Sequence, residues 1–81
     1  MKDRRRELRM PAAEAARILF KDGGYDCTLR DLSLDGARLE VAIPAAMIPD
    51  QIELLLIKDG VRHTARVIWR QSQQIGVRFI R

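Results

Sequence analysis

The chain has 81 residues, a formal net charge of +4, one cysteine and one histidine. That length allows one small domain with a thin core, and no apolar stretch approaches the length of a membrane span. A lone cysteine cannot form an internal disulfide, and one histidine beside one cysteine offers neither a metal cluster nor a nucleophile motif. We therefore expect a cytoplasmic protein, or a domain cut from a longer chain, that is not an enzyme and carries no metal or cofactor.

Residues 1–9 are predicted to form a basic arm. They hold five basic side chains against two acidic ones, whereas the rest of the chain holds ten against nine. This asymmetry indicates an anionic partner handled by the N-terminus. Arg4, Arg5 and Arg9 are candidates because a guanidinium can pair with phosphate, meet the acceptor edge of guanine and stack on a base. A solvated tail is the plainer interpretation of this segment taken alone.

Alternating apolar and polar residues predict short strands along the rest of the chain. The first strand is expected over residues 14–20, and a turn at Lys21–Gly24 in which the glycine pair supplies positive φ. The next two strands, residues 25–30 and 37–41, flank a polar stretch. Two prolines make residues 42–50 a loop with one helical turn, which we expect to lie over an end of the core.

The second half of the chain repeats the alternation. Strands are expected over residues 51–57, 61–70 and 75–79, with Asp59–Gly60 as a two-residue turn and residues 71–74 as a polar connection. About six short antiparallel strands with turn signals every 8–12 residues predict an all-β sandwich or barrel. In so small a chain, closure into a barrel would remove exposed strand edges.

Strand parity also assigns three unusual side chains to the interior. Cys27, His63 and Trp69 fall at inward positions of their strands. Cys27 is therefore expected to be a small core residue rather than a reactive thiol, and His63 to have a structural role. Trp69 is expected in the core and not in a ligand site.

Residues 31–36, DLSLDG, break the pattern. If the alternation continued, Asp31 would point into the core, where an unpaired carboxylate is costly. The strand is therefore expected to end, bulge or open to solvent there. Asp31, Ser33 and Gly36 would then supply an anion, a hydroxyl and a position that tolerates close backbone approach. A simple hairpin turn is the plainer alternative.

Taken together, the two segments resemble the PilZ domain, a receptor module for the bacterial second messenger cyclic di-GMP. Residues 5–9, RRELR, are similar to the family's RxxxR motif, and the preceding Arg4 also fits. Residues 31–36 are similar to its (D/N)xSxxG motif, and residues 65–70 with 76–79 to its last hairpin. The order of the motifs and the strand pattern fit as well, so the resemblance covers nearly the whole chain.

The resemblance implies a six-stranded antiparallel barrel over residues 11–81, with residues 1–10 as a flexible ligand-binding arm. It implies one ligand site shared by both motifs and formed by Arg4, Arg5, Arg9, Asp31, Ser33 and Gly36. The arginines would hold the guanines and phosphates of cyclic di-GMP, and the second motif would meet a guanine from the barrel surface. Many PilZ domains end in a C-terminal helix, whereas no helix is predicted after the last strand here.

The leading hypothesis is a non-catalytic receptor whose arm orders on cyclic di-GMP and changes the surface offered to a downstream protein partner. Two alternatives stay open: a PilZ-fold interaction module without a ligand, and a small barrel that binds nucleic acid. The nearly neutral body argues against nucleic acid as the partner.

Overall fold

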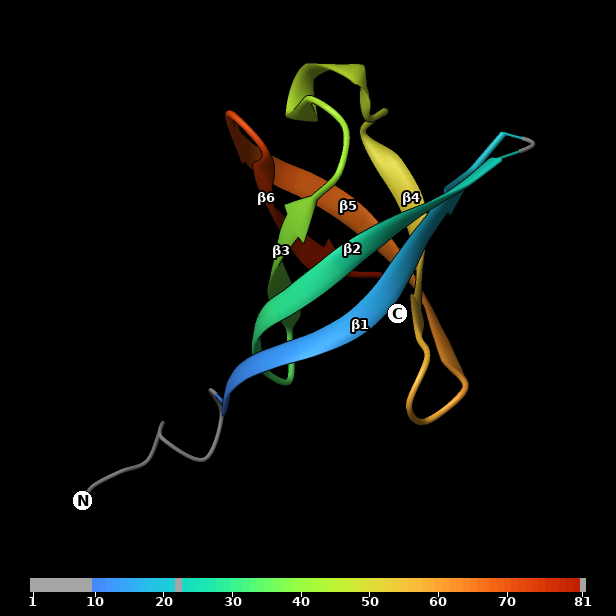
Figure 1. Ribbon diagram of the computed structural model, residues 1–81, viewed down its shortest axis with the longest axis vertical. Coiled ribbons are helices and arrows are strands. Elements are labelled where there is room, and N and C mark those ends of the chain that lie inside the picture. Colours follow the sequence, from blue (N-terminus) through green and yellow to red (C-terminus); the bar gives the residue numbers. More distant parts are fainter. Residues whose placement is uncertain (1–9, 22, 81) are drawn as a thin grey trace.

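The computed structural model describes residues 10–21 and 23–80 and shows a closed barrel of antiparallel strands (Figure 1). The strands follow the order β1–β2–β3–β6–β5–β4, and β1 pairs with β4 to close the ring. The barrel predicted from the alternation is confirmed. The six strands are β1 (Met10–Phe20), β2 (Gly23–Leu32), β3 (Gly36–Val41), β4 (Gln51–Leu56), β5 (Val61–Gln71) and β6 (Gln74–Phe79).

Alternate residues of the strands fill the barrel. The large side chains with the least exposure are Ile18, Leu39, Leu54 and Ile75, which come from four different strands. Burying each of them contributes about 1.5–3 kcal/mol relative to leaving it in water. The period-two pattern of the sequence is therefore the pattern of the core.

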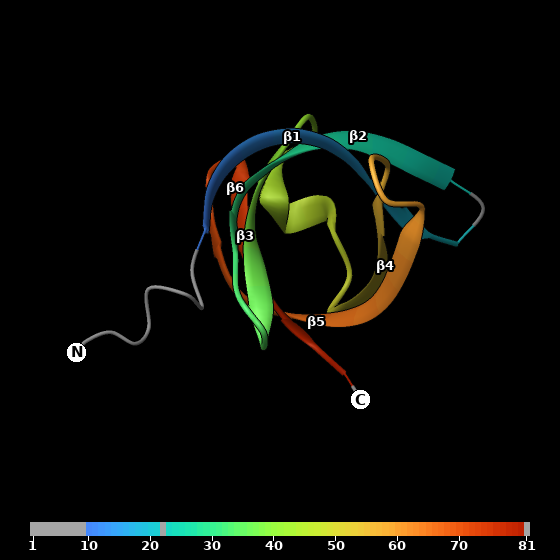
Figure 2. The ribbon, with the colours of Figure 1, turned by 90° about the horizontal axis from the view of Figure 1, so that it is seen from below.

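A short 3₁₀ turn, η2 (Ala45–Met47), closes one end of the barrel. Ala45 and the following Ile48 are each 2% exposed, so the loop adds two side chains to the core. Arg70 of β5 holds this loop by donating from Nε to the Ala45 carbonyl at 3.2 Å and from Nη2 to the Ile48 carbonyl at 2.9 Å. Seen from the opposite end, the turn lies inside the ring of strands (Figure 2). The predicted helical turn over the end of the core is confirmed.

The turn between β1 and β2 differs from the prediction. Gly23 and Gly24 belong to β2 instead of turning the chain, because Phe20 already pairs with Gly23. Among the described residues of this turn, Lys21 has a positive φ, of 54°. A two-residue connection thus begins earlier than the glycine pair suggested.

The turn between β4 and β5 is also longer than predicted. Leu56 pairs with Val61, so residues 57–60 form a four-residue loop and not the two-residue turn expected at Asp59–Gly60. Gly60 has a φ of 68° and donates its N–H to the Leu56 carbonyl at 2.8 Å. The glycine supplies the left-handed conformation, but within a wider loop.

Cys27 and His63 have structural surroundings, as parity predicts. Cys27 is 7% exposed, and its pKa is raised to about 12 by burial and by the charge of Asp26, against an opposing effect of Arg17. The thiol stays protonated at neutral pH and is a poor nucleophile. His63 stacks on Phe79 with ring centroids 4.4 Å apart. Within the described residues, no helix is long and apolar enough to cross a bilayer.

Candidate ligand-binding site

Strand β2 bulges just before Asp31. Leu29 pairs with Leu39 and Asp31 with Arg38, which leaves Arg30 as an extra residue. A bulge of one residue moves the side chains that follow it to the other face of the sheet. Leu29 is therefore buried, while Asp31 lines a hollow on the outer wall. The predicted interruption at Asp31 is confirmed as a bulge that keeps the carboxylate out of the core without ending the strand.

Strand β5 has a second bulge, just before Trp69. Val67 pairs with Val77 and Trp69 with Gly76, so Ile68 is the extra residue. Trp69 is 39% exposed and Ile68 57% exposed. The prediction that Trp69 belongs to the core is wrong, because the bulge reverses the alternation on which it depended.

The Trp69 indole lies over Gly76 of the neighbouring strand. A Cβ at Gly76 would collide with the indole atoms Nε1, Cε2 and Cδ1. A ring that covers a strand glycine is held close to the sheet, because no side chain separates it from the backbone. The indole is thereby fixed on the outer wall as a partly exposed aromatic surface.

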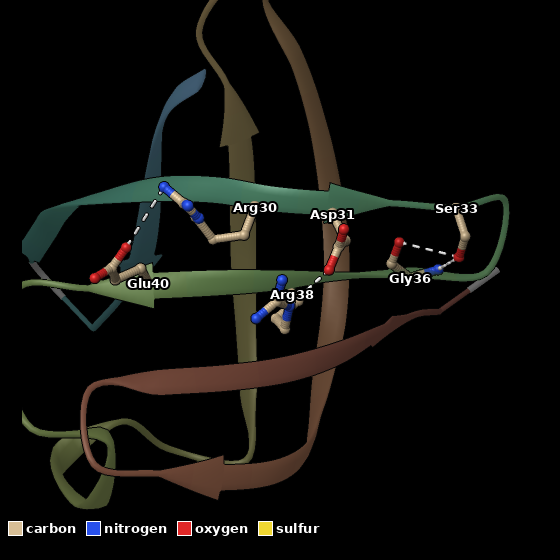
Figure 3. Close-up of polar contacts among 6 residues, drawn as sticks. All are labelled: Arg30, Asp31, Ser33, Gly36, Arg38 and Glu40. Carbon is tan, nitrogen blue, oxygen red and sulfur yellow. Dashed lines mark hydrogen bonds and ion pairs between the residues drawn. The ribbon is translucent and has the colours of Figure 1, made fainter. Parts of the chain in front are cut away.

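Ser33 organises the turn that joins β2 to β3. Its hydroxyl accepts from the N–H of Gly36 at 3.2 Å and donates to the Gly36 carbonyl at 3.3 Å (Figure 3). It also accepts from the N–H of Asp35 at 3.3 Å. The Ser33 N–H donates to the Gly36 carbonyl at 2.9 Å. A serine hydroxyl used in this way substitutes for backbone partners in a tight turn. The hydroxyl is therefore part of the turn, as the plainer interpretation of this stretch expects.

Gly36 is needed because two strands approach closely. A Cβ at this position would collide with the Val77 carbonyl oxygen on β6. Among the described glycines, the left-handed φ occurs at Gly60 and not here. The expectation of a close backbone approach is confirmed.

Arg38 is a second residue of the hollow, besides Trp69, that the sequence analysis did not assign to the site. Its Nε donates to Oδ2 of Asp31 at 2.6 Å from the paired position on β3 (Figure 3). The side chains of Asp31 and Arg38 are 19% and 42% exposed, so the pair is partly sheltered. Asp31 is thus already partnered, although a carboxylate with two oxygens can accept further hydrogen bonds.

The hollow on the outer wall brings these groups together. It has a volume of about 530 Å³ and extends over β2, β3, β6 and β5. The cross-strand register places four of its residues in one row, which three strand spacings make about 14 Å long. This row, called the wall row below, consists of Asp31, Arg38, Gly76 and Trp69.

Strand β1 begins beside the hollow. The sequence assigns Met10 to the arm, whereas its backbone pairs with Leu32, and Pro11 pairs with Asp31. Leu32 and Asp31 both line the hollow. The chain that precedes Met10 therefore joins the barrel at the rim of the site. The predicted ligand residues Arg4, Arg5 and Arg9 lie outside the described residues.

The described part of the chain contains no group of three or more His, Cys, Asp or Glu side chains that could hold a metal ion. The wall row places a carboxylate, a guanidinium and an indole next to one another in the hollow, which Asp35 and Arg78 also line. Such a surface suits a flat, polar ligand with both donors and acceptors.

Comparison with known families gives a match over most of the chain. The family model of the PilZ domain matches residues 3–81, which is nearly the whole chain. Comparison with the curated proteins gives no match. PilZ domains are non-catalytic receptor domains, and the family is known to bind cyclic di-GMP. The family model covers nearly the whole chain, and the structure is the closed barrel that the resemblance implies. The chain therefore belongs to the PilZ domain family.

Proposed function

We propose that this protein is a cytoplasmic receptor that binds cyclic di-GMP between its N-terminal arm and the hollow on the barrel wall. The observation that carries the proposal is the wall row, in which an acceptor, a donor and an aromatic surface lie side by side at the place where β1 begins. Cyclic di-GMP has two phosphates and two guanines. A ligand of that kind needs both charge-assisted contacts and flat surfaces.

The arm and the wall have different roles in the proposed complex. Arg5 and Arg9, with Arg4 beside them, pair with the phosphates and stack on the bases. Asp31 accepts hydrogen bonds from the N1–H and amino group of one guanine. Ser33 and Gly36 contribute by shaping the wall, since the hydroxyl of Ser33 is engaged in the turn.

Trp69 joins the proposed site because it lies on the outer wall and lines the same hollow as Asp31. Stacking of a base on an aromatic side chain contributes about 1–3 kcal/mol. We expect Trp69→Ala to weaken binding accordingly and Trp69→Phe to restore part of the affinity. A nuclear Overhauser contact between indole and guanine protons would test the position directly, and its absence from a saturated complex would remove Trp69 from the site.

Ligand binding is expected to act as a switch. The arm would close on cyclic di-GMP and change the surface presented to a downstream protein partner. Backbone relaxation of residues 1–9 should show order parameters that rise when cyclic di-GMP is added. An arm with the same order in both states would contradict this mechanism while leaving ligand binding untouched.

The test of ligand choice is isothermal titration of the whole chain. We expect saturable binding of cyclic di-GMP and weak binding of single-stranded oligonucleotides that falls steeply with salt. Tight oligonucleotide binding without heat from cyclic di-GMP would favour a nucleic-acid-binding barrel. No binding of either would favour a protein-interaction module.

A matched pair of arginine variants tests the arm. Arg9→Ala should weaken cyclic di-GMP binding roughly 10- to 150-fold, the equivalent of one charge-assisted contact, and leave the Tm unchanged. Arg62→Ala is the control, because Arg62 is 60% exposed on β5 and pairs with Glu53 away from the hollow. Equal affinities of the two variants would count against the arm as part of the site.

A further inference from the structure

We propose that Arg38 recognises the base directly, and that the Asp31–Arg38 pair selects guanine over adenine in a cyclic dinucleotide. The inference rests on the proposed function, because it names the groups that choose the base at that site. It assigns a ligand role to a residue outside both sequence motifs.

The geometry of the pair favours this role. Arg38 contacts Asp31 through Nε, which is one of the five N–H donors of a guanidinium. That contact, at 2.6 Å, orients the planar group, so that its remaining donors have a defined direction. An oriented fork suits recognition better than a mobile one, since less freedom is lost on binding.

The residues around Arg38 leave space for a flat ligand beside its guanidinium. The residue that pairs with Arg38 on β6 is Gly76, which has no side chain and is covered by the Trp69 indole. Across the wall row, Arg38 therefore has a carboxylate on one side and an aromatic ring on the other. A base stacked at the indole would have its edge turned toward Arg38 and Asp31.

The order of groups along the pair matches the edge of guanine. Guanine presents its amino group and N1–H as donors, followed by O6 and N7 as acceptors. Asp31 accepts from the first two, and Arg38 donates to the last two. Adenine places an amino donor where guanine has O6 and an acceptor where guanine has N1–H. Both side chains would then face a group of the wrong kind.

Selectivity is measured by titrating the whole chain with cyclic di-GMP and cyclic di-AMP. A bidentate contact of this type discriminates bases by about 5- to 150-fold, so the wild-type chain should prefer cyclic di-GMP by at least that factor. Arg38→Met keeps the length of the side chain and removes the donors. It should lower the preference by about that factor, by weakening cyclic di-GMP and leaving cyclic di-AMP nearly unchanged, while the part of the preference due to Asp31 stays.

Arg78→Met is the matched control. Arg78 lines the same hollow from β6, where it pairs with Gly36 and not with Asp31. Its removal deletes the same charge and should alter both affinities by a similar factor. If Arg38→Met also changes both equally, or changes neither, Arg38 does not read the base. If the wild-type chain fails to bind cyclic di-GMP, the proposed function fails with it.

An analogue of cyclic di-GMP with 7-deazaguanine separates direct contact from mere support of Asp31. The wild-type chain should bind this analogue several-fold more weakly than cyclic di-GMP, and Arg38→Met should bind the two alike. Equal binding by the wild type would assign Arg38 to holding Asp31 and overturn the direct contact. Arg38→Lys should not restore the preference, because a point charge lacks the fork, and it provides the test if Arg38→Met does not fold.

Discussion

Two turns at the same end of the barrel have nearly the same sequence pattern and different structural roles (Figure 1). Residues 33–35 join β2 to β3 and with Gly36, the first residue of β3, read SLDG; residues 57–60, IKDG, join β4 to β5. A Cβ at Gly60 would meet nothing within 4 Å, and its φ of 68° is the reason for glycine. A Cβ at Gly36 would strike the backbone of β6. Gly60 is needed for its backbone conformation and Gly36 for close packing against β6. The turn that contains Gly36 lines the hollow, and the turn that contains Gly60 does not.

The largest expected effect follows from adding one methyl group to each turn. Gly36→Ala should destabilise the fold by at least about 3 kcal/mol, because the neighbouring backbone cannot move aside as a flexible side chain would. Gly60→Ala should cost about 1–2 kcal/mol, which is the cost of a left-handed conformation with a Cβ. Urea denaturation of both variants measures the difference. Equal losses would show that the two glycines have the same role.

A smaller effect is expected from the polar side chains of the turns. Ser33→Ala removes a hydroxyl that binds two amides and a carbonyl, and should cost about 1 kcal/mol. Asp59→Ala changes an exposed residue and should stay within about 0.5 kcal/mol. Thermal melting of the two variants checks the order. A larger loss at Asp59 would reverse the contrast between the turns.

The smallest expected effect is on the rate at which the Cys27 thiol reacts with a thiol-labelling reagent. Cys27 lies on β2, the strand that leads into the SLDG turn. With its pKa raised to about 12 and its side chain buried, the thiol should react very slowly at pH 8. Ser33→Ala loosens the turn of the β2–β3 hairpin that contains Cys27, so labelling should accelerate more than the loss of global stability requires. Gly60→Ala should accelerate it only in proportion to stability. If labelling in both variants accelerates only in proportion to the loss of global stability, the hairpin does not open independently of global unfolding.

The same pKa sets a dependence of stability on pH. The folded thiol keeps its proton, whereas the unfolded thiol begins to ionise near its ordinary pKa of 9.0. A rise in pH above 9 therefore stabilises the unfolded state relative to the folded state. The contribution of Cys27 is complete below pH 9 and is lost progressively up to about pH 12. In Cys27→Ala, that part of the alkaline loss should be missing from a series of urea titrations.

The sequence predicted the barrel well because half-buried strands alternate, and the alternation survives in a single chain without any knowledge of pairing. It predicted an interruption at the site of the first bulge and missed the second bulge for a physical reason. At Asp31 an unbroken alternation would bury a charge, and the cost of that burial signals an irregularity. At Trp69 an unbroken alternation buries an indole, which is acceptable in a core and also on a surface. Nothing in Ile68 marks it as the extra residue.

Arg38 could not be found by the same means. Its outward parity is visible in the sequence, but its importance comes from its pairing with Asp31 on one side and with Gly76 on the other. Register belongs to two strands together, and the bulge at Arg30 shifts it by one residue. The prediction for the turn between β1 and β2 was wrong because Lys21 adopts a positive φ itself, although a glycine follows two residues later.

The pairing of Met10 with Leu32 has a consequence for the energetics of the arm. In the proposed complex the arm is a tethered binding partner, so its arginines would meet a ligand on the wall at an effective concentration on the order of millimolar, whatever the concentration of the protein. Arg5 precedes Met10 by five residues, which span at most about 18 Å when extended. Trp69, at the far end of the wall row, lies four strand spacings or about 19 Å from β1, so that reach ends close to the far end of the row. Moving the tether point by inserting flexible residues after Arg9 would therefore dilute the arm locally, and affinity for the proposed ligand would fall although every contact residue was kept.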